Sequence, residues 1–145
     1  MARTYRQLLR TDPERLRAHS APGVWSPLEY VCHYRDVLRV QRERILLALK
    51  KDKPSFESMR REERVTEERY NEQDPAAVGV EIAVAADELA TTLEKLSDRD
   101  WLREGVYSYP TRQLRSAEWI ARNTIHEGLH HIMDIERQLE DSSGL

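Results

Sequence analysis

The sequence predicts an all-α fold, a four-helix bundle, from two observations. Apolar side chains recur every three to four residues over long stretches, for example at Val78, Ile82, Ala85 and Leu89, which is the period of a helix with one buried face. No long stretch shows the alternation of apolar and polar residues that marks strands. With 145 residues, the chain is expected to form a single domain over residues 1–145.

Three long helices are expected, and two of them have a clear start signal. Ser26-Pro27-Leu28-Glu29 combines an N-cap serine, a proline at the first helical position and a glutamate two residues later, which is a capping box and predicts a helix over about 27–50. Asp74-Pro75 repeats the cap and proline and predicts a helix over about 75–97. Ser116 opens the last helix, over about 116–140.

The remaining segments are expected to be shorter. The first helix covers only about residues 3–10, and Asp12-Pro13 starts another short one. The charge-rich stretch 51–73 is expected to be a long solvated connection with one or two helical turns near 59–69. An extended loop or irregular hairpin is expected over residues 104–114, and a frayed tail is expected over residues 140–145.

Composition argues against several classes of protein. The net charge is −3 with 34% charged residues of mixed sign, so the chain lacks the basic surplus of a nucleic-acid-binding protein. No apolar run reaches the roughly 18 residues of a membrane span, and the N-terminus lacks the apolar core of a secretory signal, so we expect a cytoplasmic protein. A lone cysteine, Cys32, excludes multi-thiolate zinc sites within one chain; we expect a packed, inert thiol.

The histidines predict a metal site in the bundle. His126 and His130 are four residues apart, so they share a helical face with Cβ atoms roughly 6 Å apart and could hold one metal ion. His33 lies on an apolar stripe of an earlier helix, from which it could meet them. Facing helices of bundles commonly build such sites. The alternative is that these are core histidines hydrogen-bonded to other groups.

The stretch from His126 to His131 also allows other interpretations. Glu127 and His131 are also four residues apart, but we prefer His126 and His130 because Trp119 and Met133 share their stripe. The string His126-Glu127-x-x-His130 matches a metalloprotease motif, but the further ligand that such enzymes require is missing from the short remaining chain. Acidic residues one turn after a histidine, Asp36 and Asp134, could orient a ligand imidazole or form ordinary surface ion pairs.

Three stretches, Trp25–Val37, Tyr70–Pro75 and His126–Ile135, resemble the DinB-like (DinB/YfiT) superfamily, near its mycothiol-dependent maleylpyruvate isomerase-like members. The resemblance implies a four-helix bundle, often a homodimer, with a divalent metal such as zinc or nickel. Carried over by position, the implied metal ligands are His33, His126 and His130.

Three functions are consistent with such a site. The leading hypothesis is a metal- and thiol-dependent transferase or isomerase, in which the metal activates a mycothiol- or bacillithiol-type thiol. The second is a metal-dependent hydrolase that activates water instead. The third is a non-enzymatic dimeric metal-binding module. The sequence names neither the substrate nor the catalytic residues.

Overall fold

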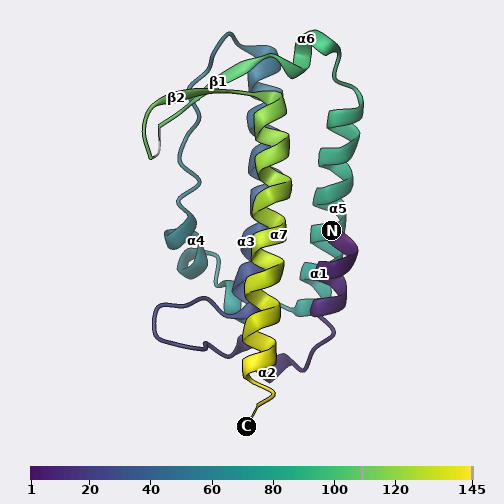
Figure 1. The fold of residues 1–145 in the computed structure, drawn as a ribbon, viewed down its shortest axis with the longest axis vertical. Coiled ribbons are helices and arrows are strands. Elements are labelled where there is room, and N and C mark those ends of the chain that lie inside the picture. Colours follow the sequence, from purple (N-terminus) through teal and green to yellow (C-terminus); the bar gives the residue numbers. More distant parts are fainter. Residues whose placement is uncertain (109, 145) are drawn as a thin grey trace.

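Three long helices dominate the computed structural model, which describes residues 1–108 and 110–144 (Figure 1). They are α3 (Pro27–Lys50), α5 (Pro75–Glu94) and α7 (Ala117–Asp141). Helix α3 packs against both α5 and α7, and the short α1 (Ala2–Leu8) lies against α5 as the fourth member. The predicted all-α four-helix bundle with a short first helix is confirmed.

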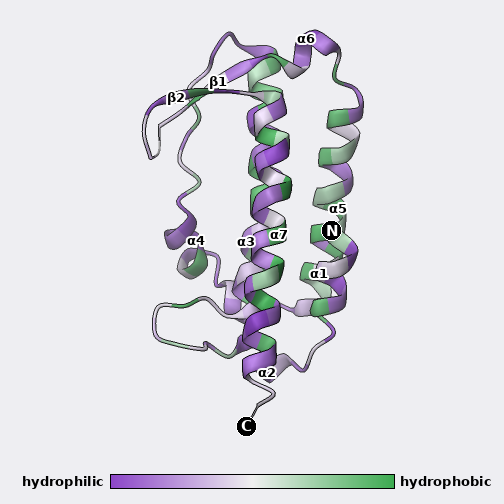
Figure 2. Cartoon of the chain, viewed as in Figure 1, coloured by the Kyte–Doolittle hydropathy of each residue, from purple (hydrophilic) through white to green (hydrophobic). Residues whose placement is uncertain are grey.

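The connections carry the smaller elements. These are α2 (Pro13–Arg17), α4 (Arg61–Glu67), the 3-10 helix η1 (Tyr70–Glu72), α6 (Asp98–Trp101), β1 (Glu104–Tyr107) and β2 (Gln113–Ser116). Helix α5 is rich in hydrophobic residues, whereas α4 is mostly hydrophilic (Figure 2). None of the helices in the two described ranges is long and apolar enough to span a membrane.

The long helices begin where their caps predict. The Ser26 hydroxyl accepts a hydrogen bond from the Glu29 N–H (3.2 Å), and the Glu29 carboxylate accepts one from the Ser26 N–H (2.8 Å). Asp74 caps α5 by accepting from two backbone N–H groups, and Ser116 caps α7. Because these bonds satisfy N–H groups that lack a partner within the helix, local sequence is enough to fix these boundaries.

The connection between α3 and α5 differs from the expected solvated segment. The Phe56 N–H donates to the Val106 carbonyl (2.9 Å), and the Val106 N–H donates to the Pro54 carbonyl (2.8 Å). This attaches the connection to the antiparallel hairpin of β1 and β2. Phe56 and Tyr70 are both buried. Most charged residues of α4 are exposed, although Arg64 reaches the buried Asp36 (3.5 Å). Buried aromatic residues anchor the connection on either side of that helix.

Two tyrosines set the distance between the helices around α7. The rings of Tyr5 and Tyr34 stack with centroids 4.9 Å apart. The Tyr5 hydroxyl donates to the Gly128 carbonyl (2.7 Å), and the Tyr34 hydroxyl donates to the Thr124 carbonyl (3.0 Å). Tyr5 and Tyr34 therefore fill the interior opposite the small residues of α7.

The end of α7 contacts a residue of α2. The helix continues to Asp141, and the Arg15 guanidinium donates to the Leu139 carbonyl and to the hydroxyls of Ser142 and Ser143. Leu145, the last residue of the expected tail, lies outside the described residues.

Candidate metal centre

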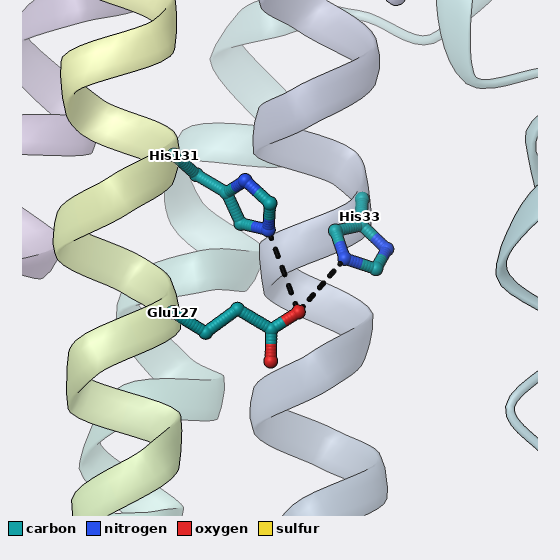
Figure 3. A group of neighbouring side chains, drawn as sticks. All are labelled: His33, Glu127 and His131. Atoms are coloured by element: carbon teal, nitrogen blue, oxygen red, sulfur yellow. Dashed lines mark hydrogen bonds and ion pairs between the residues drawn. The ribbon is translucent and has the colours of Figure 1, made fainter. Parts of the chain in front are cut away.

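Three side chains from two helices converge between α3 and α7 (Figure 3). His33 comes from α3, whereas Glu127 and His131 come from successive turns of α7. Glu127 Oε1 lies 3.3 Å from His33 Nε2 and 3.4 Å from His131 Nε2. One ligand atom from each residue lies within 4.8 Å of the other two.

The cluster is buried, and its nitrogen atoms are poorly satisfied. His33 is 1% exposed and His131 7%, while the Glu127 side chain is 27% exposed. His33 Nδ1 and both ring nitrogens of His131 have no hydrogen-bond partner among the described residues. Buried polar atoms normally have one, so these imidazoles are expected to bind something further.

Burial and hydrogen bonding set the ionisation of the cluster. Burial lowers the pKa of His33, although its hydrogen bond with Glu127 opposes this, so the imidazole is neutral near pH 7. Burial would raise the pKa of Glu127, but the nearby imidazoles of His131 and His33 outweigh it and lower that pKa to about 2. The cluster therefore offers a neutral imidazole on His33 and a carboxylate on Glu127, which are the forms that metal binding requires.

The spacing of the cluster fits a divalent transition metal. Two ligands held about 2.0–2.1 Å from one tetrahedral ion lie roughly 3.3–3.4 Å apart, which matches the distances from Glu127 Oε1 to the two Nε2 atoms, 3.3 and 3.4 Å. Two histidines and one glutamate form a donor set of catalytic zinc sites, which keep a further position open for water or substrate. His33, Glu127 and His131 are therefore suitable ligands.

The structure does not bring His126 and His130 to His33. Both are exposed on α7, and their rings pack against each other with centroids 4.4 Å apart. The expectation that this pair borders or faces the bundle interior is therefore wrong. Met133, whose place on the same stripe supported that expectation, is itself 54% exposed.

The reason is the close approach of α7 to two tyrosines. A Cβ atom at Gly128 would lie 2.4 Å from Tyr34 Cζ, so only glycine fits there. Ala117, Ala121 and Thr124 are also buried. The interior face of α7 thus combines these small residues with Ile120, Ile132 and Ile135, and Glu127 and His131 border it. A glycine inside a long helix was the signal that could have revealed this orientation.

Aromatic residues border the cluster. The Trp25 ring lies 4.9 Å from the His33 ring, and the Tyr30 ring lies 5.3 Å from the His131 ring, measured between centroids. On its outer face, Trp25 packs beneath the Arg61 guanidinium, 5.0 Å from the ring centroid. These rings leave the carboxylate of Glu127 as the most exposed part of the cluster.

The two acidic residues predicted to orient a ligand imidazole, Asp36 and Asp134, make different contacts. Asp134 lies 4.0 Å from His131 Nδ1 and 3.8 Å from an Arg137 nitrogen, so it is close to His131 but too far away for a hydrogen bond. Asp36 instead accepts hydrogen bonds from Arg35 (2.9 Å) and Tyr70 (2.5 Å) inside the bundle and forms no bond to His33.

Cys32 takes no part in the cluster. The residue is fully buried, and its Sγ lies 3.7 Å from the Tyr70 carbonyl. Burial raises the pKa of the thiol to about 12. The thiol is therefore protonated and unreactive near pH 7, as the sequence predicted.

Comparisons with known proteins agree with this fold. The sequence profile of the DinB superfamily matches residues 1–133. No curated protein sequence matches the chain. Among solved structures, YfiT from Bacillus subtilis superposes with a TM-score of 0.81 at 16% identity, covering 96% of this chain and 81% of that one. It is described as a probable metal-dependent hydrolase with an unusual four-helix bundle topology.

A second similar structure is that of an enzyme described as dependent on a thiol. The mycothiol-dependent maleylpyruvate isomerase superposes with a TM-score of 0.69 at 15% identity, covering 90% of this chain. The match covers 55% of the isomerase, so the present chain spans about half of that protein. At such identities both similarities establish the fold.

Proposed function

The chain is a member of the DinB superfamily, and we propose that it is a metal-dependent enzyme whose metal is held by His33, Glu127 and His131. The observation that carries this proposal is the convergence of three ligand atoms within 4.8 Å around buried nitrogens that have no other partner among the described residues. A zinc or nickel ion fits these nitrogen and oxygen donors.

Each residue has a distinct part in this proposal. His33 and His131 provide two nitrogen donors, and Glu127 provides the one negative charge. Asp134 is the carboxylate next to His131 Nδ1 (4.0 Å), and a closer approach would let it orient that ring, as carboxylates commonly do for ligand histidines. A divalent metal held there supplies Lewis acidity, which lowers the pKa of a thiol or water that binds to it.

We propose a low-molecular-weight thiol, of the mycothiol or bacillithiol type, as the nucleophile for a transfer or isomerisation reaction. With Glu127 as its one anionic ligand, the site has room for a further negative charge. The Trp25 and Tyr30 rings beside His33 and His131 also offer favourable contacts for sulfur. Both features suit a thiolate.

The thiol hypothesis is tested by titrating the native thiol of the source cell into cobalt-loaded protein. We expect an intense near-ultraviolet thiolate-to-cobalt absorption band that saturates at one equivalent. Trp25→Leu should weaken thiol binding while leaving cobalt affinity unchanged, because Trp25 borders the site without being a ligand. If no such band forms in protein that does bind cobalt, the thiol hypothesis is wrong and the metal site still stands.

The second candidate is a metal-dependent hydrolase. It is supported by the donor set, since two histidines and one glutamate also serve zinc hydrolases, and by the partial exposure of Glu127 (27%), which gives water access. Metal-loaded protein should then cleave members of a panel of esters and amides without added thiol, and Glu127→Gln should abolish cleavage. Dependence of all turnover on thiol would exclude this candidate.

We also propose that the protein forms a homodimer, on the basis of the family resemblance. Light scattering coupled to size-exclusion chromatography measures this directly. A mass near 34 kDa, twice the 17.1 kDa of one chain, is expected. A mass of one chain at micromolar concentration would contradict it.

A further inference from the structure

The exposed histidine pair on α7 has the geometry of a metal chelate. His126 and His130 are exposed on this 25-residue helix, and their rings lie edge to face with centroids 4.4 Å apart. We propose that they form a second metal site, separate from the buried centre, that binds a divalent transition metal such as Cu²⁺, Ni²⁺ or Zn²⁺. This inference does not depend on the proposed function.

The helix already holds the two imidazoles in position. Residues four apart in a helix have Cβ atoms about 5–6 Å apart, so one ion can be reached by both rings without a change of the backbone. Within the described residues, neither imidazole has a hydrogen-bond or ion-pair partner that an ion would have to displace. By contrast His19, another exposed histidine, is paired with Glu29 at 2.9 Å.

The ligand type selects the class of ion. Two imidazole nitrogens suit transition metals, and affinity in such sites generally rises toward Cu²⁺. Mg²⁺ and Ca²⁺ prefer oxygen ligands and should not compete. Because the pair is exposed, water can complete the coordination, and the solvent screens the charge of the ion.

The two sites cannot share one ion. Successive residues of a helix point about 100° apart, so Glu127 and His131 face α3 while His126 and His130 face solvent. The protein should therefore bind two ions at excess metal. Total metal content alone would then overstate the occupancy of the buried centre.

The experiment uses protein from which the buried centre has been removed by a change on another helix. In His33→Ala, the buried cluster loses its ligand from α3, while α7 is untouched. Calorimetric titration of this variant with Cu²⁺ should show one site. Adding His126→Ala or His130→Ala should weaken that site by at least about tenfold, because chelation by two linked ligands is lost. His19→Ala is the matched control and should not change the affinity.

A second measurement is the melting temperature of these variants with and without Cu²⁺. Bridging the two imidazoles stabilises the native state, so Cu²⁺ should raise the melting temperature of His33→Ala but not of His33→Ala combined with His126→Ala. The proposal is wrong if His33→Ala binds no Cu²⁺, or if removing His126 or His130 has no more effect than removing His19. None of these outcomes depends on whether the buried centre binds metal.

Discussion

The ring of Tyr34 occupies the space that a side chain at position 128 would need. A Cβ atom there would lie 2.4 Å from both Cζ and the hydroxyl oxygen of Tyr34. Gly128 follows Glu127 directly and lies about one helical turn before His131. This contact therefore sets how close α7 comes to α3 and which of its residues face His33.

Gly128→Ala should destabilise the protein. Alanine in a helix interior normally gains about 0.5–1 kcal/mol over glycine, but the clash with Tyr34 should outweigh this and lower the free energy of unfolding by about 1–3 kcal/mol. Urea denaturation measures the change. The displaced helix should also bind metal more weakly.

Gly79→Ala is the matched control for this variant. A Cβ at Gly79, in α5, would make an ordinary contact 3.5 Å from a Leu9 methyl group, so this change should be neutral or stabilising. Equal stability of the two variants would show that the Tyr34 contact does not constrain α7.

The starts of the long helices could be predicted from the sequence because their signals are local. Ser26, Asp74 and Ser116 each cap a helix through bonds to residues two or three positions away. His33 could also be predicted as buried, from the apolar stripe that it shares. These features depend on neighbours in the chain, and both the fold and one side of the candidate site follow from them.

The orientation of α7 could not be predicted in the same way. Large residues such as Trp119 and Met133 favoured the stripe of His126 and His130, but the interior beside α7 is already filled by Tyr5 and Tyr34 from other helices. Small residues therefore face inward. The sequence alone therefore does not indicate that Glu127 and His131, rather than His126 and His130, lie next to His33.

Asp36 should make stability fall at acidic pH. Burial raises the pKa of Asp36, but hydrogen bonds from Tyr70 and Arg35 and the charge of Arg35 outweigh it, so its pKa lies below the ordinary 3.8. A carboxyl with a lowered folded pKa contributes stability above its unfolded pKa and loses it as pH falls through the folded value. The free energy of unfolding should therefore decline below about pH 3.8.

Asp36→Asn tests this contribution. At pH 7 the variant removes the carboxylate that lies 2.9 Å from buried Arg35, which keeps Glu81 at 3.0 Å, so the loss should be about 1.5–3 kcal/mol. Its unfolding free energy should also fall less steeply below pH 3.8 than that of the wild type. Asp87→Asn, on the exposed face of α5, should change neither quantity. A wild-type pH slope in Asp36→Asn would refute the assignment.

Removing the metal should lower the melting temperature only modestly. A metal ion present at one hundred times its Kd stabilises the folded protein by about 2.7 kcal/mol. A domain of this size buries enough surface to fold without metal. Calorimetry with and without a chelator measures the effect, and circular dichroism should show the helices retained. Complete unfolding on chelation would favour the non-enzymatic structural module instead.

The central claim is that His33, Glu127 and His131 hold the metal, and adjacent residues on α7 test it most directly. The measurement is zinc affinity, by competition with a chelator, for His131→Ala and His130→Ala. His131→Ala should lose at least about 100-fold in affinity for the tight site, beyond the loss typical of residues that only orient ligands. His130→Ala should retain that site unchanged. The reverse result, with His130 required and His131 dispensable, would contradict the assignment.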